Sequence, residues 1–303
     1  MTLKEQIQAV IDETKIDAGV AVWQIESGEQ FDINGSELFP MASVVKIPVL
    51  AAAGKLLAAG KLSFDQRVPL KDSDKSIGSG DLQFLAAGLN PTFRDLLTLM
   101  IIISDNTATD MCIDLIGGGA VVEQTMRDLG LDDIYVKMNV KELLRMLFPP
   151  EARNLPKDEL EKWEETHDVD RDGVVFKRTS ENNVSTPLAM SQLVYKLYQG
   201  EVVDNPTKDG LIDILLKQTL NARLPRFLPR GVRFAHKTGT IGGTRNDSGM
   251  MYISDTNHVI ITAFTIWDAA AARNQPFVEQ QRIYEVDSAI GKIGRLVYDH
   301  YSQ

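Results

Sequence analysis

Segments typical of β-strands lie near both ends of this chain, and a helical period dominates the long stretch between them. Residues 19–33 hold two strand-like runs around a turn signal at 26–29. Three more such runs lie at 233–240, 249–254 and 258–267. Neither group alone is expected to form a stable sheet. We therefore predict that both groups meet in one antiparallel five-stranded sheet.

The two ends of the chain also have the period of amphipathic helices. Apolar residues recur at helical spacing at the N-terminus (3–11) and between residues 277 and 297. The sequence thus predicts an α/β (α+β) fold in which both terminal helices lie on the sheet. Residues 1–60 and 221–303 form a discontinuous sheet subdomain in this prediction, residues 61–220 form an all-helical subdomain, and a functional site lies between them.

Charge and cysteine usage exclude several classes of partner. The 303 residues include 32 basic and 42 acidic ones, without long blocks of one sign, which argues against nucleic acid and anionic membranes as partners. The one cysteine, Cys112, lies in an apolar helical stretch and is expected to be a buried, inert thiol. The amphipathic N-terminus is no signal peptide, so we expect a cytoplasmic protein; the alternative is an exported protein whose leader has been removed. The oligomeric state stays open.

A serine and a lysine stand at the head of an otherwise apolar segment. Residues 39–57 read FPMASVVKIPVLAAAGKLL, which is typical of a buried helix, yet Ser43 and Lys46 lie three positions apart in it. Burial pushes a lysine toward its neutral, proton-accepting form. The positive end of a helix dipole favours an oxyanion at a serine there. The pair is thus a nucleophile beside its own base, or else an N-cap serine with a snorkelling lysine.

Two further motifs favour the catalytic interpretation. Ser104-Asp105-Asn106 follows the apolar run LLTLMIII, and Lys237-Thr238-Gly239 lies on a predicted strand. This trio, in this order, is the signature of class A β-lactamases and penicillin-binding proteins. The sequence therefore resembles the serine β-lactamase and penicillin-binding-protein superfamily, closest to class A, over nearly the whole chain. SDNTATD, NVSTPLAM and HKTGTIGGTRND are supporting stretches.

The resemblance implies a role for each residue of the first two motifs. Ser43 attacks a carbonyl and forms an acyl-enzyme, and Lys46 takes its proton or supplies the electrostatics if another base does so. Ser104 relays a proton to the leaving nitrogen, because a hydroxyl both donates and accepts. Asn106 orients Lys46 and the amide group of the substrate. Asp105 is structural.

The third motif and the residues after it are implied to bind substrate. Lys237 places positive charge near Ser104 and a substrate carboxylate, to which Thr238 donates. Gly239 lets the substrate approach the strand edge closely. In the family the backbone N–H groups of the nucleophile and of the residue at Thr240 form the oxyanion hole. Arg245 resembles a carboxylate-anchoring arginine; a solvated surface arginine is the alternative.

The sequence departs from class A in the loop that follows the second motif. Efficient class A enzymes have a Glu-x-x-Leu-Asn stretch whose glutamate activates the deacylating water, and this chain has none. Residues 149–182 form instead a long charged excursion, partly helical near 156–165. Glu142, Asp170 and Glu181 are the candidate substitutes, and none is favoured by spacing.

Several other polar residues are interpreted as structural. His236 lies next to Lys237 on a strand, so its side chain points to the opposite face and is expected to be packed. His167, Asp168, Asp170 and Asp172 lack the spacing of an EF-hand, so we expect a charged loop, no metal and no cofactor. Trp163 either anchors that loop by packing or lines a site.

Three functional hypotheses follow. The favoured one is a hydrolase that turns over a β-lactam or another amide or ester, a small-molecule substrate with a carboxylate. The second is a penicillin-binding peptidase or acylation sensor that deacylates slowly. The third, a non-enzymatic binding module, is disfavoured by the intact motifs.

Overall fold

A five-stranded antiparallel sheet joins the two ends of the chain. The computed structural model describes residues 1–164, 167, 169–272 and 275–303. The strand order is β2-β1-β8-β7-β6, so the N-terminal hairpin is continued by the C-terminal strands through the β1–β8 pair, and the predicted sheet is confirmed. The strands are β1 (Asp17–Gln24), β2 (Gln30–Ile33), β6 (Arg233–Ile241), β7 (Thr244–Ser254) and β8 (Asn257–Ile266).

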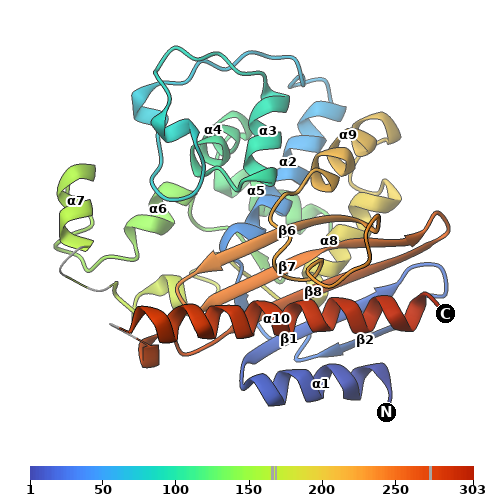
Figure 1. Ribbon diagram of the computed structural model, residues 1–303. Coiled ribbons are helices and arrows are strands. Elements are labelled where there is room, and N and C mark those ends of the chain that lie inside the picture. The colour runs from blue at the N-terminus through green and yellow to red at the C-terminus, as the bar shows by residue number, and fades with distance from the viewer. Residues whose placement is uncertain (165–166, 168, 273–274) are drawn as a thin grey trace.

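Helices α1 (Leu3–Thr14) and α10 (Pro276–Tyr301) lie together along one face of this sheet (Figure 1). Ile7, Ile290 and Ile293 are fully buried in an apolar cluster that includes the sheet residue Met251. The predicted position of the terminal helices is confirmed. The apolar side chains of α10 pack in this cluster, so they lie on one side of the helix, whereas its other side carries charged residues.

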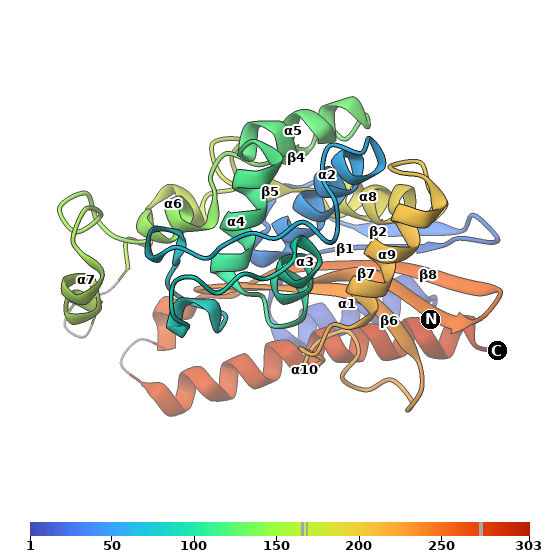
Figure 2. The same cartoon turned by 90° about the horizontal axis from the view of Figure 1, so that it is seen from above.

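Most of the remaining helices form a layer on the opposite face, and α8 packs on β1 and β8 (Figure 2). Helix α2 is buried along most of its length in the largest apolar cluster of the protein. It packs against α3, α4, α5 and α9, although the predicted division at residue 60 assigns it to the sheet part. That division stays a prediction. The helices of this layer are α2 (Lys46–Ala58), α3 (Phe93–Ile102), α4 (Asn106–Ile116), α5 (Gly119–Asp128), α6 (Val140–Arg145), α8 (Pro187–Gln199) and α9 (Asn205–Leu216). Helix α7 (Lys157–Glu164) projects away from this layer in both views (Figures 1 and 2).

A second, small sheet was not expected from the sequence. Strands β3 (Phe39–Pro40), β5 (Val184–Ser185) and β4 (Ile134–Tyr135) pair in the order β3-β5-β4. Strands of two residues are too short to show a period of two, so no pattern predicts them. Their effect is local, because β3 leads directly into the segment that bears Ser43.

The charged excursion 149–182 has a small apolar core of its own. Phe148, Ala152 and Leu160 are buried together, and the predicted helix in this stretch is α7. Trp163 contacts Phe148 edge to face, with ring centroids 5.7 Å apart, which fits the interpretation that it anchors the loop by packing. Asp168 lies outside the described residues.

The described residues contain neither a candidate membrane span nor a candidate metal cluster. No helix in this part of the chain is long and apolar enough to cross a membrane. No group of three or more His, Cys, Asp or Glu side chains within it is arranged to hold a metal ion. Cys112 is fully buried, as expected, and burial raises the pKa of its thiol.

Candidate active site

Ser43 lies on a single 3₁₀ turn, η1 (Ala42–Val45), that runs directly into α2. The sequence pattern predicted one continuous helix here, and the structure corrects this, because α2 begins only at Lys46. In a 3₁₀ turn residues three apart eclipse one another, so Lys46 follows Ser43 on the same side. Ala42 has a φ of 46°, in the left-handed region that alanine rarely adopts. The turn is therefore held by its surroundings and not by local preference.

The amine of Lys46 is fully buried and joins the first two motifs. Its Nζ lies 2.7 Å from the Ser104 backbone oxygen, 3.0 Å from Ser104 Oγ and 3.0 Å from Asn106 Oδ1, so a neutral amine can donate to two of these oxygens and accept from the Ser104 hydroxyl. Within the part of the chain that the structure describes, the Ser43 hydroxyl has no hydrogen-bond partner. The structure thus brings Lys46, Ser104 and Asn106 into contact, as the motif roles require.

Burial lowers the pKa of Lys46 to about 7, against the opposing influence of the Asp105 and Asp110 carboxylates. A lysine with such a pKa is largely a neutral amine at slightly alkaline pH, with a lone pair that accepts a proton. This is the state that a general base needs.

Ser104 has a strained backbone conformation. Its φ is 59°, in the left-handed region, which costs on the order of 1–3 kcal/mol for a residue with a Cβ. The following Asp105 caps α4, since its Oδ1 accepts from the Ala108 N–H at 2.8 Å. Its Oδ2 accepts from the N–H groups of Asp81 and Leu82 at 2.8 and 2.9 Å. Asp105 is therefore bonded as a structural residue.

A cavity of about 100 Å³ lies beside Ser43. Of the nine predicted site residues, Ser43, Asn106 and Thr240 line it. Much of its wall is apolar and comes from α6 and the end of β6. The lining residues are Ala42, Ser43, Val45, Gly78, Ser79, Asn106, Val140, Leu143, Leu144, Asn183, Thr240 and Ile241.

Strand β6, the edge strand of the sheet, carries the third motif. Lys237 is fully buried and its Nζ donates to the Thr238 carbonyl at 2.8 Å, so in the described contacts it does not bond Ser104. Burial holds the pKa of Lys237 well below its usual range, and repulsion from the Lys46 amine is the second cause. Thr238 is also buried, whereas Thr240 is exposed at the strand edge.

Gly239 packs against the turn that carries Ser43. A Cβ at this position would lie 2.5 Å from the Met41 carbonyl oxygen and 3.1 Å from the Val44 backbone nitrogen. The sequence predicts that Gly239 lets the substrate approach the strand closely, but the structure shows another reason for a glycine here. The absence of a side chain lets β6 and η1 come together.

We expect Gly239→Ala to displace η1, because the clash involves backbone atoms that no rotamer change relieves. The free energy of unfolding should fall by about 1–3 kcal/mol, and acylation of Ser43 should slow about 10- to 100-fold through misplacement of the nucleophile. Urea denaturation and stopped-flow acylation measure the two effects. Gly119→Ala is the matched control, since its nearest contact would be an ordinary 3.6 Å. Wild-type acylation in Gly239→Ala would contradict this explanation.

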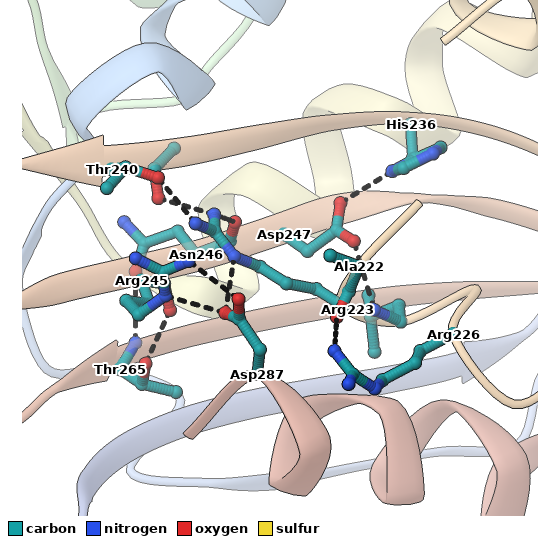
Figure 3. Close-up of polar contacts among 12 residues, drawn as sticks. Ala222, Arg223, Arg226, His236, Thr240, Arg245, Asn246, Asp247, Thr265 and Asp287 are labelled. Atoms are coloured by element: carbon teal, nitrogen blue, oxygen red, sulfur yellow. Dashed lines mark hydrogen bonds and ion pairs between the residues drawn. The ribbon is translucent and has the colours of Figure 1, made fainter. Parts of the chain in front are cut away.

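Arg245 is held on the α10 side of the sheet (Figure 3). Its Nε and an NH2 nitrogen donate to the two carboxylate oxygens of Asp287 at 2.6 Å each. The buried Arg223 also donates to Asp287, at 3.0 Å, and reaches the β6 backbone. Arg245 does not line the Ser43 cavity, and its role as a carboxylate anchor stays a prediction. The buried His236 bonds Asp247 Oδ1 at 2.8 Å on this face, so the packed histidine is confirmed.

Comparison with known proteins agrees with this geometry. The profile described as "Beta-lactamase enzyme family" matches residues 2–301, nearly the whole chain. The chain belongs to the beta-lactamase enzyme family. This confirms the resemblance drawn from the three motifs, and it makes the protein a serine β-lactamase-like hydrolase rather than a binding module without activity.

Individual relatives of this β-lactamase family member are distant. Beta-lactamase VEB-1 of Pseudomonas aeruginosa is 26% identical over 275 residues, which cover 87% of this chain and 81% of the relative. A β-lactamase structure from Sphaerobacter thermophilus is 28% identical with a TM-score of 0.76, covering 99% of this chain and 96% of that one. A mutant of PBP-A, solved as its acyl-enzyme complex with penicillin G, is 25% identical with a TM-score of 0.77, over 99% and 96% of the two chains.

None of the three candidate deacylation bases lines the cavity beside Ser43 in this β-lactamase-like site. Glu142 is engaged in the N-terminal cap of α6, where its Oε2 accepts from the Asn139 N–H at 3.0 Å. Asp170 pairs with Arg153 at 3.6 Å, and Glu181 is exposed. No Asp, Glu or His is among the described residues that line the cavity. The wall facing Ser43 is instead formed by Val140, Leu143 and Leu144.

Asp110 fixes this wall, and the sequence analysis did not single it out. Its buried carboxylate accepts from the N–H groups of Val140 and Lys141 at 2.7 and 2.9 Å and from Ser76 Oγ at 2.6 Å. Burial raises the pKa of this carboxyl. Asn106 and Asp110 are four positions apart on α4, so helical spacing was a usable signal that they share a face.

Proposed function

We propose that Ser43 is acylated by β-lactams, with Lys46 as the general base. The Ser43 Oγ attacks the lactam carbonyl and its proton passes to the neutral Lys46 amine. As the lactam C–N bond breaks, that proton passes through the Ser104 hydroxyl to the leaving nitrogen. The observation that carries the proposal is the Lys46 amine, buried, with a pKa lowered to about 7, one turn from Ser43 and bonded to Ser104 and Asn106.

The surroundings of Ser43 suit such a substrate. The exposed edge at Thr240 and the N-terminus of the Ser43 turn offer backbone N–H groups for the oxyanion. Lys237 and Thr238 on β6 are the groups that would receive a carboxylate, and Arg245, bound to Asp287 on the α10 side of the sheet, would do so only after leaving that partner. The acyl-enzyme that penicillin G forms with the PBP-A mutant, a structural neighbour, supports the same chemistry here.

Intact-protein mass spectrometry with a penicillin tests the proposal. We expect a mass increase of one penicillin per chain, located by peptide mapping on the peptide that contains Ser43 and absent from Ser43→Ala. A label on another residue, or one that persists in Ser43→Ala, would overturn the assignment.

The pKa of Lys46 predicts how acylation depends on pH. The reactive form is the neutral amine, so the rate should rise with pH up to about 7 and then level off. Two units below that pKa, only about one lysine in a hundred is neutral, so acylation at pH 5 should be roughly a hundredfold slower than the plateau. Single-turnover stopped-flow from pH 5 to 9 measures it. A rate independent of pH over that range would contradict a basic role for Lys46.

A second candidate function is a penicillin-binding peptidase or an acylation sensor. The cavity favours it, because no carboxylate among the described lining residues is available to activate water. Turnover of a D-alanyl-D-alanine ester with slow loss of a penicillin adduct would support the peptidase. Adduct formation without peptide turnover would support the sensor.

A further inference from the structure

Arg223 makes four hydrogen bonds behind the edge strand, and two of them are to Gly239 and Thr240, at the proposed oxyanion site (Figure 3). Its NH1 donates to the Gly239 carbonyl at 2.7 Å and to the Asn246 carbonyl at 2.6 Å. Its NH2 donates to Thr240 Oγ1, and its Nε donates to Asp287 at 3.0 Å. The residue is 4% exposed, so solvent competes little for these hydrogen bonds.

The Gly239 carbonyl and the Thr240 N–H belong to the same peptide group. Gly239 and Asn246 are direct partners in the β6–β7 register, and Arg223 bonds both carbonyls, so the Gly239 oxygen points toward β7. No cis peptide bond occurs in the described chain, and a trans peptide directs its C=O and N–H to opposite sides. The Thr240 N–H therefore points away from β7, toward the open edge where Thr240 and Ser43 line the cavity.

We propose that Arg223 is a positioning residue that strengthens the oxyanion hole through the Gly239–Thr240 peptide group. A guanidinium that donates to a carbonyl draws electron density toward that oxygen and makes the attached N–H a better donor. Hydrogen bonds in such a chain reinforce one another, and a charged donor gives the larger effect. This inference rests on the proposed function, since it needs an acyl carbonyl bound at Thr240.

Asp287 holds the Arg223 guanidinium in place. Asp287 accepts bonds from both Arg223 and Arg245, so one carboxylate faces two guanidinium groups. Asp287 thus fixes the direction of the Arg223 fork, and the buried Asp247 carboxylate is a second negative charge near Arg223. The hydrogen bond from Arg223 to Thr240 Oγ1 also fixes the residue that follows Gly239 on β6.

Two substrates, one with a carboxylate and one without, distinguish this role of Arg223 from carboxylate anchoring. An anchor matters only for a substrate with a carboxylate, whereas a polarised N–H matters for every acyl group. We would therefore acylate Ser43 with a penicillin and with p-nitrophenyl acetate, which is uncharged, in Arg223→Gln, Arg223→Lys and wild type. Arg226→Gln is the matched control, because Arg226 lies in the same loop but donates to the Ala222 carbonyl.

Removing an oxyanion donor outright costs about 10²- to 10³-fold, and weakening it by a tenth to a third should slow acylation by about 2- to 10-fold. We expect this loss with both substrates in Arg223→Gln, a smaller one in Arg223→Lys and none in Arg226→Gln. Infrared spectra of the acyl-enzyme, with a ¹³C-labelled carbonyl, should show the ester stretch at higher wavenumber in Arg223→Gln, because its carbonyl receives a weaker hydrogen bond.

Only folded enzyme carries the ester, so the infrared band is independent of how much of a variant folds. If Arg223→Gln yields no folded protein, the Arg223→Lys band decides. An unshifted ester band, or a rate loss confined to the penicillin, overturns the role of Arg223 while leaving the acylation of Ser43 intact. Absence of any ester band in wild type overturns the proposed function, and this inference with it.

Discussion

Replacement of Lys46 by methionine should lower the rate of Ser43 acylation by about 10²- to 10⁴-fold, the usual contribution of a general base. Methionine keeps most of the volume in a fully buried position and removes the amine that bonds Ser104 and Asn106. Acylation that remains should lose its dependence on pH around 7, because the group that titrates there is absent. Stopped-flow with a chromogenic cephalosporin at saturating substrate measures the rate.

Lys55→Met is the matched control for this variant. Lys55 lies on the same helix but is partly exposed and pairs with Asp128, at 3.9 Å, so acylation should be unchanged. Circular dichroism should show native α+β content in both variants. A rate within about threefold of wild type in Lys46→Met would move the basic role to another group, since even modest general-base catalysis contributes more than that.

Most of the fold could be predicted from segments in which the pattern of apolar residues extends over many positions. The strands that became β1 and β8 alternate or run apolar, and their pairing joins both ends of the chain as predicted. Strand β7 was placed from residue 249, but it begins at Thr244. Its first residues include Arg245, Asn246 and Asp247, whose polar side chains are paired by tertiary contacts that a sequence pattern does not show.

The site divides in the same way. Lys46, Ser104 and Asn106 were found from motif spacing because short local segments fix them. Arg223 carried no signal, since its partners on β6 and β7 are distant in sequence and meet only in the folded sheet. The apolar wall of Val140, Leu143 and Leu144 was also not predicted, because an apolar pattern does not show which residues will line a catalytic cavity.

The apolar wall of Val140, Leu143 and Leu144 should make deacylation slower than acylation by about 10²- to 10⁴-fold. This is the factor that general-base activation of water normally supplies. No carboxylate lines the cavity within the described chain, and the amide oxygen of Asn183 is already bonded to the N–H groups of Lys137 and Met138 at 2.7 and 3.0 Å. Acylation keeps its own machinery, because Lys46 and the oxyanion site act before the ester exists. A chromogenic cephalosporin should therefore give a burst equal to the enzyme present, followed by slow turnover.

The lifetime of the Ser43 ester tests the central claim most directly. Enzyme mixed with excess cephalosporin, quenched at intervals from milliseconds to an hour and weighed intact, should reach one adduct per chain during the burst. The adduct should then persist and decay at the slow steady-state rate once substrate is removed. Rapid consumption of substrate without accumulation of an adduct would contradict the account, because it would require a base for water that the described cavity does not contain.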